Sequence, residues 1–179
     1  NKIKKIRFLP GFHTRNAPHA AHQWIHEYLF KKYQSLLIQP LIGQYKKGEY
    51  KDNYIMKTNQ KAARIIKSKK VFCLPFFSYP RYGGPREAAL HAFVRKNYGC
   101  THFWIGRDHA GYKNFYSKYQ SQRFCKLYKK KIGINIVSEK EPYYSKKHQR
   151  IGNDFKKISD KDRIFISGTK IRKYILKKK

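Results

Sequence analysis

Acidic residues are scarce in this sequence. Ten Asp and Glu stand against 42 Lys and Arg among 179 residues, which gives a formal net charge of +32. Such an excess indicates an anionic partner: a nucleotide, sulfate, nucleic acid or an anionic membrane surface. The lysines are scattered or fall in short runs such as residues 129–131 and 177–179, which a compositional bias towards Lys, Ile, Asn and Tyr would also produce. The charge therefore points to anions without choosing among them.

Cysteines and long apolar runs are also few. Cys73, Cys100 and Cys125 are far apart and form no CxxC pair, so we predict buried free thiols in a reducing compartment and no metal site. No apolar run approaches the ~20 residues that span a bilayer, and no signal peptide is recognisable. We therefore expect a soluble, cytoplasmic protein without a membrane partner. A hydrophobic content of 40% excludes a disordered composition.

Strand-like and helix-like patterns alternate along the chain. Strands are predicted at residues 3–9, 36–42, 71–77, 101–105 and 134–137, with a short extended piece at 163–166. Helices are predicted at residues 18–32, 53–67, 85–98, 115–131 and 169–176. A Pro10-Gly11 turn is expected after the first strand, residues 71–77 read as a buried strand, and the polar segment 139–161 reads as irregular. The β-α-β order predicts a single α/β domain, residues 1–179, with a parallel sheet between two helical layers.

Ligands of such folds bind beyond the carboxyl ends of the strands, so we expect the site residues in the loops that follow the strands. The first loop contains Thr14, Arg15 and Asn16, which offer hydroxyl, guanidinium and amide donors. His19 and His22 are three residues apart and share a face at the start of the next helix, where backbone N–H groups attract anions. This set suits phosphate or sulfate. The alternative is a capped helix with two surface histidines.

Three further segments follow the same logic. The segment 106–111 places Arg107, Asp108 and His109 between two glycines, and its alternative is a turn with an internal salt bridge. Ser167 and Thr169 precede the last helix and can cap it or bind phosphate, with Arg172 one turn further on. The fourth segment runs from Gly83 to Glu87. There Arg86 reaches the active face or pairs with a carboxylate.

Together these stretches resemble ATP sulfurylase. The chain carries HTRNAPHAAH at residues 13–22, GPREAALHAFVRKNYGCTHFWIGRDHAG at residues 84–111 and ISGTKIR at residues 166–172, in the order of the family's patterns. The resemblance extends from about residue 6 to residue 176. It implies an HxxH-type nucleotidyltransferase fold, Mg-ATP as a substrate, a homo-oligomer, and transfer of AMP to sulfate with release of pyrophosphate in sulfate assimilation.

The resemblance also assigns roles to residues. Arg15 would bind sulfate with the backbone of Ala110 and with His13, and Thr14 and Asn16 would contact the phosphates. His19 and His22 would hold the leaving pyrophosphate. The implied ATP-binding set is His13, Thr14, Arg15, Asn16, His19, His22, Gly106, Arg107, Asp108, His109, Ser167 and Thr169. Positioned donors of this kind stabilise charge that develops during an in-line displacement.

The sequence departs from the family at several points. His13 stands where the family has Gln, and the proline after Asn16 is displaced to Pro18. The family's N-terminal domain and C-terminal extension are absent, so we expect a fragment or a minimal form. Cysteines that some members carry near Ser145 and His148 are missing, so no zinc is expected. Two alternatives stay open: an adenylyltransferase with a different acceptor, and a basic protein that binds nucleic acid without catalysis.

Overall fold

The structure, a computed structural model, describes residues 6–43 and 50–177, so part of the predicted strand 3–9 and of the 177–179 lysine run lie outside it. Its main sheet has the order β3-β2-β1-β5-β6, and every neighbouring pair is parallel. The strands are β1 (Pro10–Thr14), β2 (Leu36–Ile42), β3 (Val71–Cys73), β5 (His102–Trp104) and β6 (Asn135–Val137), and β4 (Phe76–Phe77) extends the pairing with β2. The predicted α/β class with a parallel sheet is confirmed.

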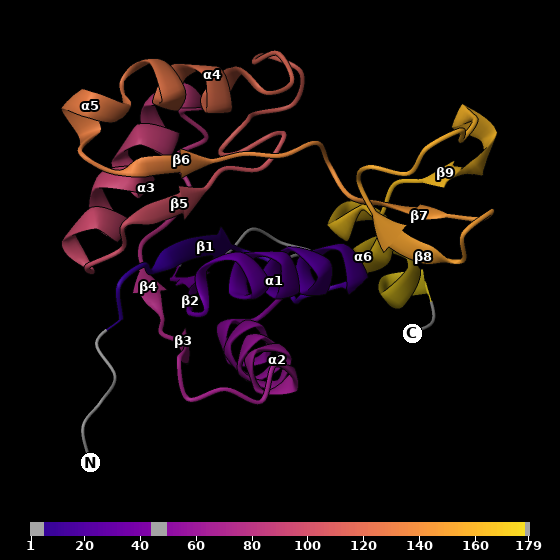
Figure 1. The fold of residues 1–179 in the computed structure, drawn as a ribbon, viewed down its shortest axis with the longest axis horizontal. Helices are drawn as coiled ribbons and strands as arrows, with labels where there is room; N and C mark the ends of the chain where they lie inside the picture. Colours follow the sequence, from indigo (N-terminus) through magenta and orange to yellow (C-terminus); the bar gives the residue numbers. More distant parts are fainter. Residues whose placement is uncertain (1–5, 44–49, 178–179) are drawn as a thin grey trace.

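Helices cover both faces of this sheet (Figure 1). One face carries α1 (Ala20–Tyr33) and α2 (Asp52–Ile65), and the other carries α3 (Pro85–Asn97), α4 (Gln120–Leu127) and α5 (Lys129–Ile132). Two hydrophobic cores result. Leu29, Leu36 and Ile38 belong to the α1/α2 core, while Leu37 and Phe103 belong to the α3/α4 core. Successive residues of a strand point to opposite faces, which is why neighbouring residues of β2 enter different cores.

The strand β1 begins at the Pro10-Gly11 pair, where the sequence predicts a turn. Proline is tolerated at the first position of a strand, where its missing N–H breaks no interior ladder bond. Gly11 is required by packing, because a Cβ at this position would lie 2.8 Å from Cγ of Arg95. The turn prediction is therefore wrong, and the strand is the central one of the sheet.

Two more elements differ from the prediction. The apolar run 71–77 is not a buried strand but two short pieces at the sheet edge, with Leu74 45% and Phe77 76% exposed, and Cys73 is half-buried. The helix predicted from residue 115 begins at Gln120. The backbone of Tyr119 is left-handed, with φ at 64°, and its N–H donates to the carbonyl of Arg107 at 2.8 Å. This tether to the preceding loop replaces the expected helical turns.

The segment 139–161 is not irregular. It contains β7 (Tyr143–Ser145) and β8 (Arg150–Gly152), which pair with each other. β7 also pairs with β9 (Arg163–Ile164), in an antiparallel sheet of order β8-β7-β9. The 3-10 helix η1 (Asp160–Asp162) precedes β9, and α6 (Gly168–Lys177) follows it. This small sheet lies beside the main one, and β8 contacts α1 (Figure 1). No helix in the described part of the chain has the length and apolarity to cross a bilayer.

Candidate active site

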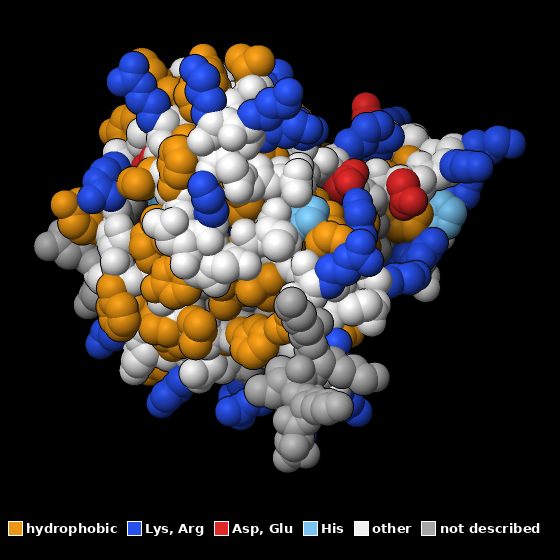
Figure 2. All heavy atoms as spheres, turned by 60° about the vertical axis from the view of Figure 1, so that its left-hand side comes forward, with side chains coloured by type: hydrophobic (Ala, Val, Ile, Leu, Met, Phe, Trp, Pro, Cys, Tyr) orange, Lys and Arg blue, Asp and Glu red, His pale blue; other side chains and the backbone are white. Residues whose placement is uncertain are grey.

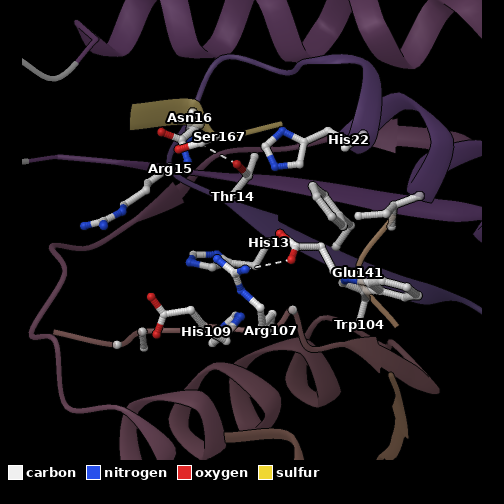
Figure 3. Close-up of a pocket in the computed structure, with 18 of the residues that line it drawn as sticks. His13, Thr14, Arg15, Asn16, His22, Trp104, Arg107, His109, Glu141 and Ser167 are labelled. Carbon is white, nitrogen blue, oxygen red and sulfur yellow. Dashed lines mark hydrogen bonds and ion pairs between the residues drawn. The ribbon is translucent and has the colours of Figure 1, made fainter. Parts of the chain in front are cut away.

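A cavity of about 380 Å³ opens where β1 and β5 end. The chain leaves β1 towards α1 and leaves β5 towards α4, on opposite faces of the sheet, so this is the topological switch point of the fold. The cavity lining includes all but one of the predicted site residues: His13, Thr14, Arg15, Asn16, His19, His22, Gly106, Arg107, Asp108, His109, Ala110 and Ser167 (Figure 3). The exception is Thr169, whose hydroxyl accepts a hydrogen bond from Arg172 at 3.3 Å.

The loop after β1 is held from three sides. The amide of Asn16 donates to Oγ1 of Thr14 at 3.1 Å, and its side-chain oxygen accepts a hydrogen bond from Arg172 of α6. The carbonyl of Asn16 accepts a bond of 3.2 Å from Nδ2 of Asn59, a fully buried residue of α2. Arg15 lies over the Tyr82 ring and donates to its hydroxyl at 2.6 Å. The loop geometry is thus fixed by residues far away in the sequence.

The N-terminus of α1 opens onto the cavity. His19 is its N-cap residue, so the helix starts two residues after Pro18, and within the described residues no side chain caps it and no acidic residue lies in its first turn. His19 and His22 stack with their ring centroids 3.8 Å apart. Burial lowers the pKa of His19 to about 4 and that of His22 well below 6.5, so both rings are neutral at pH 7. Free amides beside neutral imidazole donors form a site for an anion.

The loop after β5 is held in place by hydrogen bonds to its carbonyls. The carbonyls of Arg107, His109 and Ala110 accept hydrogen bonds from Tyr119 N at 2.8 Å, Ser121 Oγ at 2.9 Å and Gly84 N at 2.9 Å. Ala110 has a left-handed backbone with φ at 58°, which is costly for a residue with a Cβ. Its N–H has no partner among the described residues, so a strained backbone here presents a donor to the cavity.

Gly84 connects this loop to α3, and its replacement by alanine should destabilise the protein by about 2–4 kcal/mol. Its φ is +53°, and an added Cβ would lie 2.5 Å from the Tyr116 ring. Gly99→Ala is the matched control, because φ there is +83° but nothing lies within 4 Å of the added Cβ. Urea unfolding of both variants measures the difference, and equal losses of stability would contradict the steric part of this prediction.

Arg107 lines the cavity as one partner of an ion pair. Its Nη1 lies 2.8 Å from Oε2 of Glu141, and this pair crosses from the loop after β5 to the segment before β7 (Figure 3). Burial raises the pKa of Glu141, and the adjacent Arg107 opposes that rise. Glu139 accepts a hydrogen bond from the hydroxyl of Tyr28 at 2.8 Å. Four of the ten acidic residues line this cavity: Glu87, Asp108, Glu139 and Glu141.

His13 lies on the other face of the sheet from Thr14. Its ring packs against His91 at 4.4 Å and His109 at 5.4 Å between ring centroids, and its Nδ1 lies 2.7 Å from Nη2 of Arg95. Nδ1 of His91 lies 3.0 Å from Nε2 of His109, and Nε2 of His91 lies 3.7 Å from Glu87. Burial first, and then the charge of Arg95, lowers the pKa of His13 well below 6.5, so the ring is neutral.

The three imidazoles of His13, His91 and His109 offer nitrogen atoms within 4.8 Å of one another, the spacing of a metal site. The contact with Arg95 opposes that use. A guanidinium only donates, so Nδ1 of His13 accepts and its Nε2 carries the proton, which leaves no lone pair for a cation. In this arrangement the cluster is a hydrogen-bonded group of neutral histidines, and a metal ion would have to break the contact between His13 and Arg95.

Arg86 lies outside this site. It is exposed on α3 and is not part of the cavity lining, so the interpretation that it reaches the active face is wrong. The neighbouring Glu87 is buried instead, and it accepts hydrogen bonds from the amides of Arg81 at 3.0 Å and Gly83 at 2.8 Å. The Gly-Gly loop before α3 is therefore held by a carboxylate.

Comparison with known proteins agrees with this geometry. The sequence profile of the ATP-sulfurylase family matches residues 2–179. The chain belongs to the ATP-sulfurylase family. The sulfate adenylyltransferase of Pyrococcus abyssi is 37% identical over 180 residues, which cover 98% of this chain and 47% of that protein. That of Thermococcus onnurineus is 37% identical over 179 residues, which cover 98% and 46%. The chain spans about half the length of these curated relatives.

A solved structure shares the fold. The hexameric APS kinase from Thiobacillus denitrificans superimposes with a TM-score of 0.64 at 15% sequence identity, covering 93% of this chain and 31% of that one. At this identity the likeness concerns the fold alone. It places the parallel sheet of this ATP-sulfurylase family member in a known α/β architecture.

Several residues of the site were missed by the sequence interpretation. Asn59 and Tyr82 reach the site from distant segments, and their sequence surroundings give no signal. Glu141 stands in the stretch 141–144, which resembles a family segment, but the sequence interpretation assigned it no role. His91 and Arg95 do have a recognisable sequence signal, because they are four residues apart on α3 and therefore share a face. Reading that face together with the alternation along β1 would have placed both beside His13.

Proposed function

We propose that this chain is the catalytic part of a sulfate adenylyltransferase, which transfers AMP from Mg-ATP to sulfate and releases pyrophosphate. The observation that carries the proposal is the convergence of three loops on one cavity, each ending in donors suited to anions. Sulfate and a triphosphate together bring several negative charges to one place. The uncapped start of α1, the N–H of Ala110 and the guanidinium of Arg15 are positioned to receive them.

In this proposal each part of the site has one task. Arg15 and the Ala110 amide hold sulfate, while Thr14 and Asn16 contact the phosphates and stabilise the transition state. His19 and His22 hold the pyrophosphate as it leaves, and neutral rings serve as donors whose pKa the approaching phosphates raise. The sulfate oxygen forms the new bond to the α-phosphorus as the bond to the bridging oxygen breaks. Positioned donors stabilise the spreading charge, and no covalent enzyme intermediate is required.

The divalent ion arrives with the nucleotide as part of the substrate. Mg²⁺ prefers oxygen ligands and keeps several of its waters, so it needs few protein groups. Asp108, Glu139 and Glu141 line the cavity and supply such oxygens. Trp104 and Ile25 also line the cavity, and this apolar part of the lining suits the base of the nucleotide.

The test is pyrophosphate release from Mg-ATP by the intact protein, measured with and without sulfate. Sulfate-dependent release is the expected result. His13, at the position where the family has Gln, makes a different acceptor the second candidate. Selenate, molybdate and small phosphorylated metabolites should therefore be assayed in parallel. Release that one of these stimulates, and sulfate does not, would replace sulfate as the acceptor while keeping the reaction class.

The basic surface gives little support to nucleic-acid binding as the main function. Lys and Arg side chains are spread over the visible face with hydrophobic side chains between them, and they do not gather in one stripe (Figure 2). We propose only salt-sensitive, non-specific contacts of this surface with polyanions. Large exposed side chains such as Phe77 and Phe115, 76% and 79% exposed, accord with the proposed homo-oligomer.

A further inference from the structure

The most unusual charge in the described residues is that of Arg95. Its side chain is fully buried in α3, and no carboxylate of the described residues forms an ion pair with it. The guanidinium lies 4.6 Å from the Phe76 ring centroid and 5.5 Å from that of Phe103, and Nη1 donates to the carbonyl of His91 at 3.4 Å. Buried cations are usually paired with an acid, so this one needs another explanation.

The shortest polar contact of Arg95 decides the proton position on His13. Nη2 lies 2.7 Å from Nδ1 of His13, and a guanidinium has no lone pair with which to accept. Nδ1 must therefore be the accepting nitrogen, and in the neutral ring the proton sits on Nε2. The other tautomer would place two N–H groups against each other at this distance.

The protonated nitrogen keeps some exposure, and we infer that it is exposed to the cavity. His13 lines the cavity, and its Nε2 is not among the ring nitrogens that are buried without a partner, unlike Nδ1 of His19 and of His22. The ring is held on its other sides by His91 and by Phe76, whose ring centroid is 6.1 Å away. His13 therefore offers a fixed N–H donor at a fixed place.

We propose that Arg95 is a positioning residue that locks His13 in its Nε2–H tautomer, so that this neutral ring donates a hydrogen bond to the acceptor oxyanion. This inference rests on the proposed function for the identity of the oxyanion. A hydrogen bond from a cation polarises the imidazole and strengthens the donor on its far side. The buried charge of Arg95 thereby strengthens the Nε2–H donor of His13, although the guanidinium itself lies outside the cavity. An unlocked ring would populate both tautomers, and one of them would turn a lone pair towards the anion.

The first test needs no activity. ¹⁵N-labelled histidine in the intact protein is observed by long-range ¹H–¹⁵N correlation at pH 7.5, and the His13 signals are assigned by their loss in His13→Phe. We expect an unprotonated Nδ1 and a protonated Nε2 for His13. A protonated Nδ1, or an averaged pair of shifts, overturns the proposal whether or not the protein turns over ATP.

The second test separates positioning from structure. Arg95→Lys keeps a group that only donates, and it should leave the KM for sulfate within about threefold. Arg95→Gln offers an amide N–H that can donate to Nδ1 and an amide oxygen that can accept from an Nδ1–H, so it admits either tautomer. It should therefore raise the sulfate KM by about tenfold or more, the loss of one buried hydrogen bond. The KM for ATP should stay within about threefold in both variants. Equal sulfate KM values for the Lys and Gln variants would overturn the proposal.

A double-variant comparison completes the test. With His13→Phe there is no tautomer to set, so adding Arg95→Gln should change the sulfate KM by less than about threefold. A further tenfold rise would show that Arg95 acts through packing, and the proposal would be wrong. If the wild-type protein releases no pyrophosphate in response to sulfate, the proposed function fails, while the NMR result still decides the tautomer.

Discussion

Replacement of Arg15 by alanine is expected to lower sulfate-dependent pyrophosphate release by about 10³-fold, because a positioned donor to the reacting anion is lost. The guanidinium lies at the end of β1, where Tyr82 orients it through a 2.6 Å hydrogen bond and a ring contact of 4.9 Å. In the proposed reaction sulfate is held in line with the α-phosphorus, and a planar fork of two N–H groups would fix its orientation as well as its position. The sulfate-dependent rate is measured with saturating Mg-ATP.

Three further variants serve as controls for the Arg15→Ala result. Arg15→Lys retains the charge without the fork, so it should recover only part of the rate. Tyr82→Phe keeps the ring beneath Arg15 and removes the hydroxyl, and a loss of about tenfold or less is expected. Arg86→Ala removes an exposed arginine outside the cavity and should have no effect. Full activity of Arg15→Ala with folded protein would contradict the assigned role and remove sulfate from this part of the cavity.

The sequence predicted the loops of this site better than it predicted the contacts between them. The positions of β5 and α1 follow from hydrophobic period and turn residues, which are local signals. The first strand was placed at residues 3–9, whereas β1 spans Pro10–Thr14. The loop after β5 was found because glycines and charged residues stand directly behind a buried strand. The contact between Arg172 and Asn16, which are 156 residues apart, depends on how the small sheet packs against the main one. No local pattern carries that information.

His13 shows a second kind of limit. The sequence interpretation grouped it with Thr14 and Arg15 because they are consecutive. In a strand, consecutive side chains point to opposite faces, so His13 meets α3 while Thr14 faces α1. This alternation of side chains can be applied to a sequence only where the ends of the strand are known. The predicted Pro10-Gly11 turn ended the strand too early, so residues 12–14 were not treated as part of it. An error of a few residues in an element boundary thus changed the neighbours assigned to a site residue.

Strong acid destabilisation is the second large effect that we expect, and buried histidines are its cause. Burial lowers the pKa of His26 to about 3, that of His91 to about 2 and that of His109 to about 3. In the unfolded chain these rings take up protons near pH 6.5. Below that pH the unfolded state binds more protons than the native state, so stability falls as pH falls from about 6.5 towards 3.

The size of the effect follows from the number of such rings. Each contributes about 1.4 kcal/mol per pH unit once the unfolded state is protonated, so these three alone give about 4 kcal/mol per unit below about pH 5.5. His13, His19 and His22, whose pKa burial also lowers, act in the same direction. A domain with about 5–15 kcal/mol of stability should therefore unfold between about pH 5 and 3 from these three rings. The net charge of +32 adds repulsion in the same direction, but salt screens that part. Urea unfolding at pH 7.5, 6.5, 5.5 and 5.0, with and without 0.5 M NaCl, separates the two causes.

His26 offers the sharpest check on this account. It is fully buried on α1, its ring centroid lies 4.6 Å from that of Phe12, and neither ring nitrogen has a partner among the described residues. In His26→Phe a ring of similar shape replaces it without polar atoms. We expect a gain of about 1–2 kcal/mol at pH 7.5, since no buried donor is left unsatisfied, and a pH slope smaller by about 1.4 kcal/mol per unit below pH 5.5. A slope parallel to the wild type would show that His26 is already protonated in the native state. Its burial would then be compensated by a group that binds the charged ring.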